Sequence, residues 1–187
     1  MKKVILCALM ILLSMSEIAN GETRKPVNAP DQHKEDEIGN FDFIYGNDDQ
    51  AFDRMEMLID EAFSHIGTRY RSGAKGPSAF DCSGFTSYVF KQQTDIFIGA
   101  SSRDQYARNT PIRRDEIQCG DLVFFTSPNS GRNVGHVGIV VDVDPVTLEF
   151  TFIHASSKNG VKLSSSEESN YAKRYVGARR ILELSAL

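Results

Sequence analysis

The spacing of the apolar residues changes halfway along this 187-residue chain. From Ala51 to Ile66 they recur three and four positions apart, which predicts a helix with one buried stripe. A second helix is predicted from Cys82 to about Gln92. Beyond Gly120 the apolar residues form short, nearly continuous runs, which are typical of strands. Helices followed by successive strands indicate an α+β fold, with the helices packed on an antiparallel sheet.

The apolar runs of the second half predict at least four strands. Clusters of glycine, proline and polar residues separate them, as expected for turns and loops. A polar segment precedes the last strand and is interpreted as a connector. The predicted strands are Asp121–Thr126, His136–Asp142, Leu148–Ala155 and Tyr175–Leu184.

Residues 1–21 are predicted to be a secretory signal peptide. Lys2 and Lys3 form a basic n-region, and the apolar run from Val4 to Met15 is too short to span a bilayer. The small residues from Ala19 to Gly21 suit cleavage by a signal peptidase. A retained N-terminal anchor is the alternative. We therefore expect an exported protein, periplasmic or secreted, without stable membrane insertion after the signal is removed.

The remaining chain divides into a leader and one domain. Residues 22–50 form a polar leader that buries too little apolar area to offset the entropy of ordering. Residues 51–187 are long enough for a single domain with a sizeable core. The net charge of -4 argues against nucleic acid or an anionic lipid surface as the main partner.

Cys82 stands where the second helix is predicted to begin. Asp81 is suited to cap that helix, so the sulfur would lie in the first turn. Free backbone N–H groups and the helix dipole stabilise a thiolate there. After signal cleavage Cys119 would be the only other cysteine, and a disulfide between the two is the alternative. The helix-start context favours a free, nucleophilic Cys82.

Two of the four histidines belong to predicted strands. His136 lies between two glycines at the head of one strand, and His154 lies near the end of another. If these strands are neighbours, both imidazoles lie near the same edge of the sheet. We interpret His136 as the base that takes the Cys82 proton and His154 as the group that orients it. A zinc site with these three ligands is the rival hypothesis; we expect neither a metal nor a cofactor.

Several segments resemble, in order, the signatures of the NlpC/P60 family of cell-wall peptidases. Two further segments are similar to its Gly-x-x-Tyr and Ser-x-x-Gln stretches, and the likeness runs from about Met55 to Ile181. The four signature-like segments are Asp81-Cys82-Ser83-Gly84-Phe85, Gly120-Asp121-Leu122-Val123-Phe124-Phe125, Gly135-His136-Val137-Gly138-Ile139-Val140 and Phe152-Ile153-His154-Ala155-Ser156. The two further segments are Gly67-Thr68-Arg69-Tyr70 and Ser101-Ser102-Arg103-Asp104-Gln105-Tyr106.

The resemblance implies a papain-like α+β fold, with N-terminal helices packed on an antiparallel sheet of about five or six strands. It also implies that residues 51–187 form a catalytic domain that hydrolyses peptide bonds in peptidoglycan stem peptides. The bond cut in this family joins a γ-D-glutamyl group, or in some members D-Ala, to a diamino acid. Peptidoglycan stem peptides would then be the partner of this chain.

Carried over residue by residue, the resemblance implies a Cys-His-His triad. Cys82 would be the nucleophile, His136 the base and His154 the third member. The Tyr70 hydroxyl would approach the developing oxyanion beside the backbone N–H of Cys82. Alternatively, Tyr70 is only an amphipathic loop residue.

The resemblance also implies residues that bind substrate. Asp81 and Ser83 would line the substrate-binding side, with Ser102 nearby. Asp81 could instead serve only as a helix cap and Ser83 only as a first-turn residue, and Ser101 fits the register as well as Ser102. Two alternative functions stay open at this point: a non-catalytic module that binds wall peptides, and acyl transfer or thioester hydrolysis on the same fold.

Overall fold

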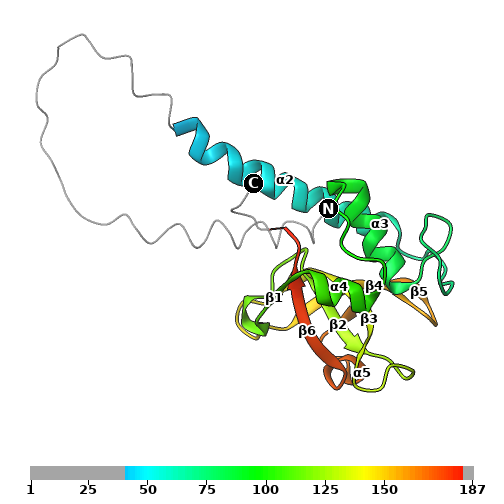
Figure 1. Ribbon diagram of the computed structural model, residues 1–187. Helices are drawn as coiled ribbons and strands as arrows, with labels where there is room; N and C mark the ends of the chain where they lie inside the picture. The colour runs from blue at the N-terminus through cyan, green and yellow to red at the C-terminus, as the bar shows by residue number, and fades with distance from the viewer. Residues whose placement is uncertain (1–40, 183–187) are drawn as a thin grey trace, which may run out of the picture.

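The computed structural model describes residues 41–182, with side chains from Phe52 onward (Figure 1). The predicted signal peptide lies outside the described residues, as does most of the predicted leader. Among the described residues, no helix combines the length and the apolar character needed to cross a membrane.

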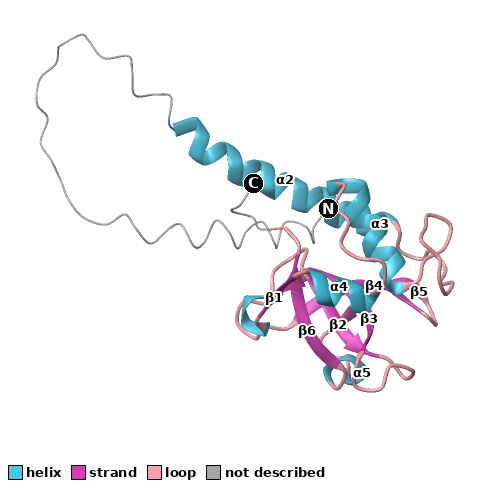
Figure 2. Cartoon of the chain, viewed as in Figure 1, coloured by secondary structure: helices cyan, strands magenta, loops and turns pink. Residues whose placement is uncertain are grey.

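The described chain forms helices followed by a sheet, as Figure 2 shows. The sheet has six antiparallel strands in the order β1-β6-β2-β3-β4-β5. The predicted α+β class and strand number are therefore confirmed. The helical elements are α2 (Phe41–Ser64), α3 (Cys82–Thr94), α4 (Ser102–Arg108), the 3-10 helix η2 (Arg114–Glu116) and α5 (Ser169–Ala172). The strands are β1 (Thr110–Ile112), β2 (Leu122–Thr126), β3 (Val134–Val143), β4 (Phe150–Ser156), β5 (Gly160–Ser165) and β6 (Tyr175–Arg180).

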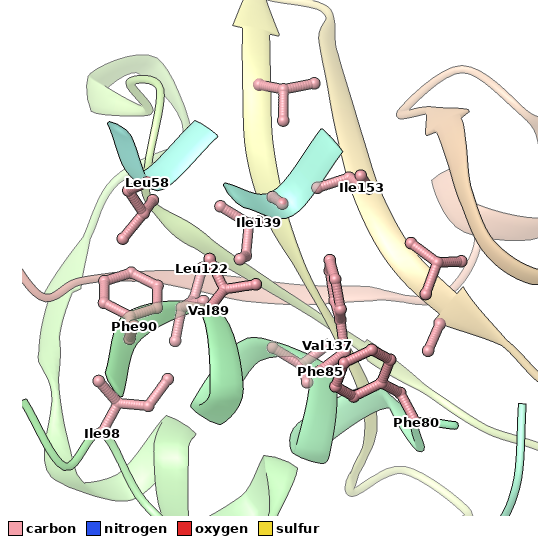
Figure 3. Close-up of a cluster of buried hydrophobic side chains, with 14 of the residues drawn as sticks. Leu58, Phe80, Phe85, Val89, Phe90, Ile98, Leu122, Val137, Ile139 and Ile153 are labelled. Carbon is pink, nitrogen blue, oxygen red and sulfur yellow. The ribbon is translucent and has the colours of Figure 1, made fainter. Parts of the chain in front are cut away.

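The main core lies between the helices and one face of the sheet. Figure 3 shows Leu58 of α2 and the α3 side chains Phe85 and Val89 among side chains from the strands. These residues are essentially removed from solvent, and apolar burial on this scale is the main force that holds the helices on the sheet. The strand residues of this core include Leu122, Phe124, Val137, Ile139, Val141, Ile153 and Ala155.

A second, smaller apolar cluster occupies the opposite face of the sheet. Alternate residues of the strands supply most of it, because successive side chains on a strand point to opposite faces, and Ile117 and Tyr171 join from outside the strands. Both faces of β2 are therefore apolar, which accounts for its nearly continuous apolar sequence. The cluster comprises Ile117, Val123, Phe125, Val140, Phe150, Phe152, Tyr171 and Ala178.

Several elements differ from those predicted. The first helix begins at Phe41, well before Ala51. The last strand ends at Arg180, before the predicted Leu184. The polar connector before β6 holds two elements that were not predicted from the sequence, β5 and the short helix α5. Strand β1, at the edge of the sheet beside β6, was also not predicted.

Candidate active site

The start of α3 is fixed by the Asp81 carboxylate. Its Oδ1 accepts hydrogen bonds from the backbone N–H of Gly84, at 2.6 Å, and from the Ser83 hydroxyl, at 3.1 Å. Its Oδ2 accepts a third from the backbone N–H of Gly73, at 3.0 Å, so the preceding loop is held to the helix. Asp81 is therefore the N-cap predicted from the sequence, and Cys82 is the first residue of the helix.

Cys82 is a free, half-buried thiol, so Cys119 is not its disulfide partner. Burial raises the pKa of the Cys82 thiol, and the Asp81 carboxylate raises it further. The backbone N–H groups of Ser83, Val137 and Cys82 itself oppose this by stabilising the thiolate. The net direction is upward, whereas the helix start alone predicted a lowered thiol pKa.

Tyr70 lies close to this helix start. A backbone bridge joins it to Phe80, one residue before Asp81. Burial raises the pKa of the Tyr70 hydroxyl, and the negative charges of Cys82 and Asp81 raise it further. The phenol is therefore near enough to both groups to interact with them electrostatically. A protonated phenol can donate a hydrogen bond to an oxyanion.

A buried glutamine holds α3 against α4. Gln105 has no solvent exposure, and its Nε2 donates to the Ser83 carbonyl, at 3.1 Å, and to the Ser87 hydroxyl, at 2.9 Å. Its Oε1 accepts a hydrogen bond from the Thr86 hydroxyl, at 3.0 Å. These contacts fix the first turn of the helix that carries Cys82.

His136 and His154 meet across neighbouring strands. They belong to β3 and β4, which pair antiparallel, and His136 Nε2 lies 2.8 Å from His154 Nδ1. The backbone N–H of Val137, which follows His136, is one of the groups that stabilise the Cys82 thiolate. Because His154 occupies Nε2 of His136, the other ring nitrogen, Nδ1, is left to exchange a proton with a substrate or a thiol.

Two hydroxyl groups contact the far side of His154. Its Nε2 lies 3.2 Å from Ser164 Oγ and 3.2 Å from the Tyr171 hydroxyl. Ser164 belongs to β5 and Tyr171 to α5, and both are buried. His136, His154 and these hydroxyls therefore form one continuous chain of polar contacts.

Both histidines are poor bases in this environment. Burial is the main cause, and it lowers the pKa of His136 to about 4 and that of His154 to about 2. The positive charge of Arg174 contributes in both cases, and Lys162 and His136 also act on His154. Both rings are therefore neutral at pH 7.

The arrangement suits proton transfer better than metal binding. The facing nitrogens of His136 and His154 point at one another at hydrogen-bond distance, rather than toward a shared third point. Among the side chains that the structure describes, from Phe52 to residue 182, no three of the histidine, cysteine, aspartate or glutamate type are placed to hold a metal ion.

The remaining predicted site residues lie around α3 and α4. The Ser83 side chain is buried and turned toward the Asp81 cap. Ser102 is the first residue of α4, and the preceding Ser101 provides the cap of that helix. The next residue, Arg103, donates to the Val134 carbonyl at 3.1 Å, which ties α4 to the start of β3. A role of these side chains toward substrate stays a prediction.

Ser164 and Tyr171 were not among the site residues predicted from the sequence. A signal was present for the strand that carries Ser164, because Val161 and Leu163 alternate with polar residues as on a half-buried strand, but the same alternation places Ser164 on the polar face. Tyr171 lies on a helix of four residues, which is too short to produce a periodic pattern.

Comparison with known proteins identifies the same region. The NlpC/P60 family profile matches residues 67–180. The probable endopeptidase p60 of Listeria grayi is 39% identical over 127 residues, which cover 68% of this chain and 23% of that protein. The chain thus corresponds to less than a quarter of the length of that relative.

A shorter relative and a solved structure extend the comparison. The murein DD-endopeptidase MepS/murein LD-carboxypeptidase of Escherichia coli strain K12 is 34% identical over 133 residues, covering 71% of this chain and 66% of that protein. The crystal structure of the NlpC/p60 domain of the peptidoglycan hydrolase SagA superposes with a TM-score of 0.56 at 33% identity. That match covers 68% of this chain and 98% of the SagA domain.

Proposed function

The chain belongs to the NlpC/P60 family, and from this premise we propose that it is an exported cysteine endopeptidase of peptidoglycan stem peptides. Its relatives include proteins named as endopeptidases and as a peptidoglycan hydrolase. We propose that the bond cut joins a diamino acid to the γ-carboxyl of D-glutamate or to D-Ala, and that residues 51–187 carry the activity.

One observation carries this proposal. A free cysteine begins α3, and a backbone N–H from the residue after His136 reaches its sulfur. His136 in turn contacts His154 at 2.8 Å. A nucleophile, a base and a group that orients the base are the parts that cysteine peptidase chemistry requires.

In the proposed acylation step the Cys82 thiol loses its proton to Nδ1 of His136 as the sulfur attacks the scissile carbonyl carbon. Because burial raises the thiol pKa, we expect a neutral thiol at rest and proton transfer during the attack. The backbone N–H of Cys82 and the Tyr70 hydroxyl stabilise the oxyanion. His136 then protonates the leaving amine, which leaves an acyl-thioester on Cys82.

In the proposed second step water hydrolyses the thioester. His136 takes a proton from the water, the new carboxylic acid is released, and the proton returns to the Cys82 sulfur. His154 holds the His136 ring throughout. Asp81, Ser83 and Ser102 are proposed to contact the substrate.

The place of action is also a proposal. The apolar run of the first 21 residues supports export to the periplasm or the exterior, where peptidoglycan is accessible. Cleavage of the secreted protein after Gly21, detected by N-terminal sequencing, tests this directly.

The decisive test of the activity is mass spectrometry of the products from defined muropeptides. We expect the wild-type protein to add one water and free one amine, with the fragment masses identifying the bond. Cys82→Ala and Cys82→Ser should reduce turnover by at least about a thousandfold while circular dichroism stays unchanged. Full activity in either variant would end the proposal, and binding without turnover by reduced wild-type protein would favour the wall-peptide binding module.

A further inference from the structure

A pair of buried hydroxyl groups ends the polar chain that begins at His136. The side chains of Ser164 and Tyr171 are 4% and 8% exposed, and each lies 3.2 Å from Nε2 of His154. They reach His154 from two separate elements, β5 and α5, so the contact is made by the tertiary structure.

The two neutral imidazoles allow two proton arrangements. In the first, His136 donates its Nε2–H to Nδ1 of His154, and His154 donates its own Nε2–H to a hydroxyl oxygen. Nδ1 of His136 is then free to accept a proton. In the second arrangement, His154 donates its Nδ1–H to Nε2 of His136, and His136 carries its own proton on Nδ1. Nδ1 of His136 then cannot accept the thiol proton.

The proton transfer itself requires the first arrangement. Once His136 has taken the thiol proton, both its nitrogens carry hydrogen, so its Nε2–H must donate to Nδ1 of His154. His154 then carries its proton on Nε2, and a buried N–H requires an acceptor. Ser164 Oγ and the Tyr171 hydroxyl are the oxygens that lie there.

Burial keeps the histidine pair neutral at rest, and nearby positive charge adds to this effect. Lys162 is the cross-strand neighbour of His154 on β5, and the Arg174 guanidinium lies over the Tyr171 ring at 5.3 Å. Burial is the largest cause of the lowered pKa of His154, and the neighbouring His136, Lys162 and Arg174 lower that pKa further. A neutral His154 has one ring proton to place, so its acceptors decide which tautomer is stable.

We propose that Ser164 and Tyr171 are positioning residues that hold His154 as its Nε2–H tautomer, and thereby keep Nδ1 of His136 open to the Cys82 proton. The proposal rests on the proposed cysteine peptidase function. It assigns a shared task to two side chains that touch neither the substrate nor the nucleophile.

The first test reads the tautomer directly in the reduced wild-type protein. Nitrogen-15 NMR with labelled histidine separates protonated from unprotonated ring nitrogens. At pH 7 we expect the proton of His154 on Nε2 and that of His136 also on Nε2. A His154 proton on Nδ1 would overturn the proposal, whether or not any variant folds.

The second test compares the variants Tyr171→Phe, Ser164→Ala and the double variant. Each single variant keeps one acceptor, so we expect losses in kcat/KM below about threefold. The double variant should lose about thirtyfold, more than the product of the singles and within the range for partners that orient a ligating histidine. The matched controls are Tyr175→Phe and Ser165→Ala. The Tyr175 ring packs on Phe125 and Phe150, and the Ser165 side chain lies on the other face of β5 from Ser164.

A third readout does not depend on any peptidoglycan substrate. The rate of Cys82 alkylation by iodoacetamide reports how readily the thiol loses its proton, either to His136 during the attack or to solvent at high pH. We expect the double variant to react about tenfold more slowly at pH 7, with the difference shrinking at high pH, where the thiol ionises without His136. Identical alkylation profiles in the folded double variant and the wild type would overturn the proposal. A wild type that hydrolyses no muropeptide would instead refute the proposed function, and the NMR and alkylation results would still decide the role of the hydroxyls.

Discussion

Asp81 influences Cys82, the proposed nucleophile, in two opposing ways. As the N-cap it sets the start of α3, and so brings the Ser83 and Cys82 backbone N–H groups to the sulfur. As a carboxylate it raises the thiol pKa of Cys82. The cap depends on the shape of the side chain and its oxygen, whereas the pKa effect depends on its charge. A substitution can therefore separate them.

Asp81→Asn keeps an oxygen acceptor for the Gly84 N–H and removes the charge. We expect the thiol pKa of Cys82 to fall and alkylation by iodoacetamide at pH 7 to become severalfold faster. Asp81→Ala removes cap and charge together, and should cost about 1–2 kcal/mol of stability, more than the asparagine variant. Alkylation over a pH series and urea unfolding measure the two effects; slower alkylation in Asp81→Asn would contradict this account.

At the scale of elements, the close approach of β3 and β4 brings the two histidines together. Gly138 makes this approach possible. A Cβ at this position would lie 2.6 Å from Cδ2 of Phe152, 3.0 Å from the Ile153 carbonyl and 3.2 Å from Cβ of His154. Gly138, the second glycine of the Gly-His-Val-Gly segment, lies two residues after the proposed base. Its missing side chain therefore lets β3 and β4 pair closely.

Gly138→Ala should force β4 away from β3 and lengthen the contact between the histidines. We expect a stability loss of about 1–3 kcal/mol and a fall in activity of at least about tenfold. Thermal unfolding and muropeptide turnover measure these effects. Gly177→Ala on β6 is the matched control, because its Cβ would meet the movable Tyr106 hydroxyl at 3.1 Å. Wild-type activity in a folded Gly138→Ala protein would show that strand spacing does not position the site.

At the scale of the whole molecule, the buried His154 and the partly buried His136 make stability depend on pH. Their pKa values are lowered in the folded state, so the unfolded chain binds more protons as the pH falls below about 6.5. Stability is therefore greatest above this value and is lost toward lower pH. The loss continues down to about pH 4 for His136 and about pH 2 for His154.

We expect His154 alone to account for roughly 2 kcal/mol of the stability lost between pH 7 and pH 5. His154→Gln should remove this share, so the free energy of unfolding should fall less steeply with pH than in the wild type. Urea unfolding at a series of pH values measures the slope. An unchanged slope in the variant would mean that His154 is protonated in the folded protein at these pH values.

The local parts of the site could be predicted from the sequence. A capping aspartate followed by a cysteine specifies the first turn of a helix, because a cap acts through backbone groups within three residues. The runs that hold His136 and His154 specify strands, because their apolar pattern is local as well. The order of these motifs also carried the family resemblance, and with it the number of strands.

What lies on the far side of His154 was decided by the tertiary structure. Ser164 and Tyr171 come from a connector whose polar composition gave no reason to place it beside a histidine. The raised thiol pKa of Cys82 has the same origin, because burial depends on segments that are distant in the sequence. Short-range hydrogen bonding and periodicity can be read along a chain, whereas desolvation and cross-element contacts exist only once the elements have packed.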